Sequence, residues 1–130
     1  MQDCRLTIIT STDGQENTLG YDGKIDVCEG VVRLIYNEKD AAICITAQKG
    51  LVVIERTGDY SLRLHLEEGK KTDGLLGIGG AVGKVQTETY RAKYLLDECV
   101  LKLSLRYNLI FSATEVQEMK LNIKAQIKKR

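Results

Sequence analysis

The sequence lacks several residue types, and each absence removes a class of structure or function. None of its 130 residues is proline or tryptophan, and only one is histidine. Because proline marks edge strands and irregular loops, a chain without it favours strands joined in a continuous hydrogen-bonded arrangement. A single histidine excludes metal sites that use several histidines.

Long apolar runs and an excess of one charge are also missing. Lysine and arginine total 19 against 18 acidic residues, so the net charge of +1 gives no general attraction to nucleic acid or anionic membranes. No run approaches the roughly 18 apolar residues of a membrane helix, and no signal-peptide core follows Met1. We therefore expect one domain over residues 1–130, soluble and cytoplasmic, with no membrane partner.

The cysteines carry no metal-binding spacing. Cys4, Cys28, Cys44 and Cys99 form no C-x-x-C pair, which is the basic unit of zinc knuckles and of thioredoxin-like sites. Each stands in an apolar strand-like run, where a reduced cysteine packs as a small hydrophobic residue. We expect four free thiols, no bound metal and no cofactor.

Alternation of apolar and polar residues is the strongest pattern present. Residues 99–109 place cysteine, leucine and tyrosine at every second position, and residues 117–127 repeat the pattern with Met119, Leu121 and Ile123. Since successive side chains of a strand point to opposite faces, this period of two predicts strands with one buried face.

Shorter strand-like runs are separated by turn residues about every eight to twelve positions, a spacing typical of β-sandwiches and barrels. The shorter expected strands cover residues 5–11, 24–28, 31–36, 42–47, 51–56, 60–66 and 84–90, with a polar loop over residues 12–23. Residues 39–48 and 88–97 contain alanines compatible with short helices, but we assign both as strands. The prediction is an all-β fold, a single antiparallel up-and-down β-barrel of about 8 to 10 strands.

The glycine-rich segment 74–83 does not bind nucleotides by a known motif. Ile78 and Val85 occupy positions where a Walker A loop needs glycine and serine or threonine, and Val82 replaces the third glycine of G-x-G-x-x-G. Glycines in a strand mark bulges, sharp bends or close backbone approach, which is the interpretation we adopt. A flap over the barrel mouth is the alternative.

No set of residues commits the chain to catalysis. The only histidine, His65, alternates with Leu64 and Leu66, so we expect it on the solvent side of its strand. The carboxylate pairs at residues 67–68 and 97–98 lie in expected turns, where charged groups are solvated. We therefore expect a protein that is not an enzyme.

The last expected strand carries a local basic stripe. Lys120, Lys124 and Lys128 share one face, and residues 129–130 extend the charge. Single-strand nucleic-acid sites combine such charge with aromatic stacking platforms, whereas Asn122 and Gln126 are interleaved here. Nucleic acid is thus disfavoured as a partner, and we interpret the stripe as protection against edge-to-edge aggregation.

The order and spacing of several short motifs resemble the YwiB-like family of small bacterial proteins of unknown function. The resemblance runs nearly end to end and rests on Gly23, Tyr36-Asn37-Glu38, Glu55-Arg56-Thr57-Gly58, Glu68-Gly69-Lys70-Lys71, Thr87 and Leu105-Arg106-Tyr107-Asn108-Leu109. It implies a calycin-like or lipocalin-like antiparallel β-barrel and no established activity. The lack of tryptophan excludes the Gly-x-Trp signature of true lipocalins.

Four residues at positions matching these motifs form the candidate ligand-binding site: Tyr36, Glu38, Arg56 and Tyr107. Converging at one barrel end, they could hold a small acidic or amphipathic ligand through ring and bidentate contacts. Alternatively, Arg56 and a carboxylate form a structural clamp. We therefore expect a binding module with a small-molecule ligand, or, as the alternative, a protein-interaction or homo-oligomerising module with a filled barrel. Monomer and homodimer both remain open.

Overall fold

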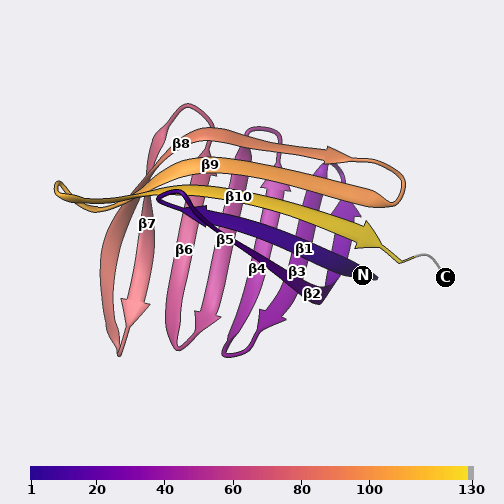
Figure 1. Cartoon of the computed structure of the whole chain (residues 1–130), viewed down its shortest axis with the longest axis horizontal. Coiled ribbons are helices and arrows are strands. Elements are labelled where there is room, and N and C mark those ends of the chain that lie inside the picture. The colour runs from indigo at the N-terminus through magenta and orange to yellow at the C-terminus, as the bar shows by residue number, and fades with distance from the viewer. Residues whose placement is uncertain (129–130) are drawn as a thin grey trace.

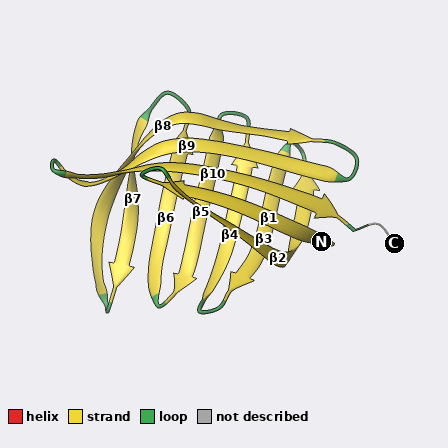
Figure 2. Cartoon of the chain, viewed as in Figure 1, coloured by secondary structure: helices red, strands yellow, loops and turns green. Residues whose placement is uncertain are grey.

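The computed structural model describes residues 1–128, which form ten antiparallel strands closed into one barrel (Figures 1 and 2). The strands are β1 (Gln2–Thr12), β2 (Gln15–Cys28), β3 (Val31–Glu38), β4 (Ala41–Gln48), β5 (Leu51–Gly58), β6 (Tyr60–Glu67), β7 (Lys71–Ile78), β8 (Ala81–Leu96), β9 (Val100–Ser112) and β10 (Glu115–Ile127). Each strand pairs with the next along the chain, and β1 pairs with β10 to close the sheet. The predicted all-β antiparallel barrel is confirmed, and residues 129–130 of the basic stripe lie outside the described residues.

The barrel has two layers whose strands cross. Figure 1 shows β3 to β7 standing side by side in one layer, while β8, β9, β10 and β1 run across them in the other. The longest strands, β2 with 14 residues and β8 with 16, belong to both layers. A β-bulge between Thr89 and Arg91 lets β8 change direction, because an extra residue bends and twists a strand.

Close backbone approach marks the corner that β2 makes. A Cβ atom on Gly23 would lie 2.7 Å from the carbonyl oxygen of Ile35 on β3, so only glycine fits there without a shift of the backbone. This corner turns β2 from its pairing with β1 to its pairing with β3.

Alternating side chains of all ten strands meet in the barrel interior. Along β9, Leu101, Leu103 and Leu105 are each no more than 2% exposed, as the period-two pattern predicts. Their cross-strand neighbours on β10 include Ile123 and Ala125, which are equally enclosed. The core is mainly aliphatic and occupies the middle of the barrel.

Residues 12–23 were expected as a polar loop, and this prediction is wrong. β1 continues to Thr12, a two-residue turn follows at Asp13-Gly14, and β2 begins at Gln15. From Gln15 to Gly20 every residue of β2 is exposed. Because neither face is buried there, the sequence has no alternation to reveal the strand.

The glycine-rich segment is a hairpin rather than a flap. β7 ends at Ile78, Gly79 and Gly80 adopt φ values of 57° and 86°, and β8 begins at Ala81. Two successive positive φ angles make the turn that suits the twist of paired strands, and glycine adopts them without strain. Residues 39–48 and 88–97 are largely strand, and residues 1–128 contain no helix long and apolar enough to span a membrane.

The expectation that all four cysteines pack as core residues is correct only for Cys4. Cys44 is half-buried and Cys28 is exposed, because both face outward on their strands, and Cys99 is half-buried in the turn before β9. All four thiols are free, and burial together with the nearby Asp3 carboxylate raises the pKa of Cys4.

Truncation of Leu103 tests the assignment of the core. Leu103 is 2% exposed, and replacing a buried leucine with alanine typically costs about 2 to 5 kcal/mol, so Leu103→Ala should strongly lower the free energy of unfolding. Lys102→Ala, on the outer face of the same strand, should leave it nearly unchanged. Chemical denaturation measures both; equal effects would contradict the inward and outward assignment.

Candidate functional site

The four candidate residues lie on the inner face of the barrel near one end. In Figure 1 the arrows of β3, β5 and β7 point to this end, below β1 and β10. Glu38 and Arg56 stand near the ends of β3 and β5, and Tyr36 lies one inward position deeper on β3. Tyr107 comes from β9 in the facing layer. Tyr36 and Tyr107 are 6% and 5% exposed, so the chain does bring these residues to one region of the interior.

Three tyrosines form the inner part of the site. The rings of Tyr21 and Tyr36 lie 5.3 Å apart, centroid to centroid. Burial raises the pKa of Tyr36, with further contributions from Glu38, Tyr21 and Tyr107, which places these groups around its hydroxyl. Burial alone raises the pKa of Tyr107 to about 12. Within residues 1–128 neither the Tyr36 nor the Tyr107 hydroxyl has a hydrogen-bond partner.

Thr89 adds a third hydroxyl without a partner. It lies directly opposite Tyr107 in the pairing of β8 with β9 and is 1% exposed. Its Oγ1 atom is fully enclosed and makes no hydrogen bond within residues 1–128. Buried polar groups are nearly always hydrogen-bonded, so this wall of the interior is unusually rich in free hydrogen-bonding capacity.

Arg56 stabilises the turn between β5 and β6. Its Nη1 donates to the carbonyl oxygen of Tyr60 at 2.7 Å and its Nη2 to Asp59 Oδ1 at 2.8 Å, while the guanidinium carbon lies 3.7 Å from the Tyr60 ring centroid. The hydrogen bond from Arg56 lowers the pKa of Asp59. Glu38 forms no ion pair within residues 1–128. Arg56 therefore clamps the β5–β6 turn through Asp59, three residues along the chain, and the clamp expected to close the barrel end with Glu38 is not formed.

Apolar side chains around the site are only partly covered. Inward-facing residues packed at the edge of the core are Tyr21, Leu62, Leu76, Phe111, Met119 and Leu121. Farther out, Tyr60 is 39% and Ile78 60% exposed, although both face the interior side of their strands. This end of the barrel is therefore open and apolar at its rim. Sequence reasoning missed the rim, because alternation identifies inward residues but not how deep they lie.

A metal ion has no evident place among the described residues. Within residues 1–128, no three histidine, cysteine, aspartate or glutamate side chains are close enough to hold one. His65 lies on the face opposite Leu64 and Leu66 and is half-buried. The expected lack of a metal or cofactor stays a prediction.

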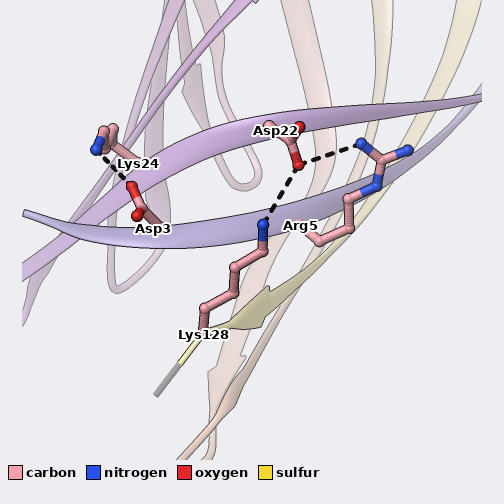
Figure 3. A network of polar contacts seen from close by, with 5 residues as sticks. All are labelled: Asp3, Arg5, Asp22, Lys24 and Lys128. Carbon is pink, nitrogen blue, oxygen red and sulfur yellow. Dashed lines mark hydrogen bonds and ion pairs between the residues drawn. The ribbon is translucent and has the colours of Figure 1, made fainter. Parts of the chain in front are cut away.

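A separate polar network joins β1, β2 and the end of β10 (Figure 3). Asp22 accepts contacts from Arg5 at 3.3 Å and from Lys128 at 3.6 Å, and Lys24 pairs with Asp3. All five side chains are more than half exposed. Exposed ion pairs contribute little to stability, so we interpret this network as ordinary surface pairing.

Comparison with known proteins identifies the family. A model described as a domain of unknown function (DUF1934) matches residues 5–123. The chain belongs to this family. The crystal structure of the YwiB protein from Bacillus subtilis is similar over 98% of this chain and 93% of that one, with a TM-score of 0.83 and 17% sequence identity. The resemblance to YwiB-like proteins is confirmed, and at this identity the structural match shows the fold alone. No curated protein matches the sequence.

The raised pKa of Tyr107 predicts alkaline destabilisation. Its phenol stays protonated in the folded chain up to about pH 12 but ionises near pH 10 when unfolded, so its stability contribution is complete below pH 10 and is lost as pH rises toward 12. Thermal unfolding from about pH 8 to about pH 11 should therefore show a steeper decline for wild type than for Tyr107→Phe. Tyr90→Phe, which changes a half-exposed ring, should follow wild type; identical slopes for all three proteins would refute the burial of Tyr107.

Double-mutant cycles test the clamp. Because Arg56 contacts Asp59, the loss of melting temperature in Arg56→Ala with Asp59→Ala should be smaller than the sum of the two single losses. Arg56→Ala with Glu38→Ala should be closer to additive, since these side chains form no ion pair and interact only through a weaker electrostatic contribution. Strong coupling of Arg56 with Glu38 instead of Asp59 would contradict the geometry.

Proposed function

We propose that this protein is a non-catalytic binding module that holds one small amphipathic ligand at the open end of the barrel. One observation carries the proposal: the Tyr36 and Tyr107 hydroxyls, which have no hydrogen-bond partner within residues 1–128, lie inside the barrel next to a half-exposed apolar rim. Small-molecule sites are typically concave and largely apolar, with a few convergent polar groups that fix orientation. The apolar part of the ligand would contact Leu62, Leu76 and Phe111, and its polar group would reach Tyr36 and Tyr107.

An amphipathic ligand fits better than a strongly acidic one. The Arg56 guanidinium is already engaged by Asp59 and by the Tyr60 carbonyl, so it offers few free donors to a second carboxylate. The half-buried Glu38 makes no ion pair within residues 1–128, although it contributes to the raised pKa of Arg56, and its charge would repel an anion. Phenol hydroxyls can donate or accept, and they suit an uncharged polar headgroup.

A binding role is also favoured over catalysis by the composition of this end. The site offers no histidine and no cysteine. The raised pKa values of Tyr36 and Tyr107 keep both phenols protonated at neutral pH, so neither is available as a general base. The free cysteines fit a reducing compartment, and we place the protein in the cytoplasm on that ground.

A thermal-shift screen with variants at the phenols tests the proposal. Uncharged and acidic amphipathic molecules, such as fatty alcohols, monoacylglycerols and fatty acids, are compared for their ability to raise the melting temperature. Each lost hydrogen bond is worth about 0.5 to 1.5 kcal/mol, so Tyr36→Phe and Tyr107→Phe should each weaken binding by about two- to tenfold. Tyr90→Phe is the matched control, because its ring lies outside the barrel.

The alternative is a module that binds proteins or its own copies and has no ligand. It would be supported if no compound stabilises the wild-type protein while light scattering gives the mass of a dimer. Equal weakening by Tyr90→Phe would also sink the proposed site.

A further inference from the structure

The outer face of β8, β9, β10 and β1 gathers cations from strands far apart in the sequence. Cross-strand pairing places Arg91, Arg106 and Lys120 in one row and Lys102 beside Lys124 in a second row. The rows are four residues apart along the strands, which is about 13 Å. Between them lie Lys93, Ser104 and Asn122. We call the residues of these rows the basic face.

Five of the six cations on this face have no acidic partner among residues 1–128. Arg91, Lys102, Arg106, Lys120 and Lys124 make no ion pair within residues 1–128, although Arg91 donates a hydrogen bond to Ser104. Lys93 reaches Glu68 at 3.7 Å. On the adjoining strands, by contrast, Arg5 and Lys128 both contact Asp22. Like charges directly opposite on paired strands repel, so this face is unfavourable in the free protein and would be stabilised by a bound polyanion.

A groove of about 720 Å³ follows the basic face. Its lining includes Arg91, Lys93, Lys102 and Lys124, the polar Ser104 and Asn122, and no acidic residue. Apolar side chains complete it, among them Ile9 and Leu95, which is 69% exposed. The basic face therefore contains a groove lined by cationic, polar and apolar side chains, which a simple row of solvated lysines would not form.

An aromatic ring stands at one end of the basic face. Tyr90, the residue within the β8 bulge, is 51% exposed, and its ring centroid lies 5.9 Å from the Arg106 guanidinium carbon. Tyr90, Arg106 and Lys120 also line a smaller recess of about 110 Å³, where Asn108 and the acidic Glu118 stand beside them. The basic stripe of β10 alone lacks such a platform; the ring comes from β8, thirty residues earlier along the chain.

We propose that the basic face binds single-stranded nucleic acid. Unpaired cations track a phosphate backbone, while an exposed ring and amide or hydroxyl groups meet bases; this combination is what single-strand sites use. Phosphates contact the two cationic rows, and a base stacks on Tyr90. An acidic peptide would satisfy the charges but would have no use for the ring. The site is on the outside of the barrel and is independent of the ligand proposed for the open end.

Fluorescence anisotropy with labelled single strands tests this proposal. Mixed-sequence RNA and DNA oligonucleotides are compared with a poly-glutamate peptide of similar charge. Neutralising about four phosphates predicts a slope near −3 for the logarithm of the association constant against the logarithm of salt concentration. Tighter binding of RNA than of DNA would identify RNA as the ligand, and equal affinities would mean that the face binds both.

The decisive variant is Lys102→Gln with Lys124→Gln, which removes one like-charge pair. Affinity should fall and the salt slope should shrink by about 1.4, because each cation contributes about 0.7. Its melting temperature should equal or exceed that of wild type, which separates loss of binding from loss of folding. Lys39→Gln with Lys84→Gln removes the same charge away from this face and should bind like wild type. Tyr90→Ala should weaken binding without changing the salt slope.

Three results would overturn the proposal. The first is no change in anisotropy at about 100 µM protein, which is the weak limit of non-specific nucleic-acid binding. The second is an equal loss of affinity in the Lys39 and Lys84 control variant. The third is binding of poly-glutamate as tight as that of the oligonucleotides. The last result would identify an acidic protein segment as the partner.

Discussion

Pairing of β1 with β10 is the constraint on which the structure depends. It joins the first strand to the last over nine residue pairs, from Cys4 opposite Ile127 to Thr12 opposite Met119. Without it the sheet would have two long edges with unpaired backbone groups, which attract other chains. Closure also decides which side chains are inside, since every strand must turn the same alternate set of residues toward a shared interior. The register of each strand is fixed by this burial, because a slip of one residue would turn the leucines of β9 outward.

The sequence predicts those parts of the fold in which one face is buried and the other solvated. Leu101, Leu103, Leu105, Ile123 and Ala125 alternate with polar residues, and their strands are found as predicted. The first half of β2 was missed because Gln15 to Gly20 are exposed on both faces, so burial left no pattern in them. Close backbone approach, one of the roles expected of the glycine-rich segment, is found at Gly74, where an added Cβ atom would lie 2.6 Å from the Arg63 carbonyl oxygen. The hairpin at Gly79-Gly80 was not predicted, because glycine permits bulges, bends and turns alike and only strand pairing distinguishes them.

The candidate site was predictable in position but not in detail. Tyr36, Glu38, Arg56 and Tyr107 do lie near one end of the barrel, which strand alternation and family motifs together indicated. The partner of Arg56 was not predictable, because the choice between Glu38 and Asp59 depends on the short turn after β5, which brings Asp59 to 2.8 Å. The sequence likewise could not predict the exposure of the rim or the burial of Thr89, since the tilt of strands in a closed barrel determines how deep each inward residue lies.

The pairing of the inward-facing residues also explains how cations of the basic face come to lie opposite one another despite their mutual repulsion. Lys102 stands opposite Lys124 because Leu103 and Ile123 must both face the core, and the outer neighbours follow from that pairing. The register fixes where these two positions meet, but it does not require lysine at either; glutamate at one of them would convert repulsion into an ion pair without disturbing the interior. Asp22 does this for Arg5 and Lys128 on the adjoining strands. Stability alone would favour the same solution at Lys102 and Lys124, so this like-charge pair is not a demand of the fold, and the anionic partner proposed above would offset its repulsion.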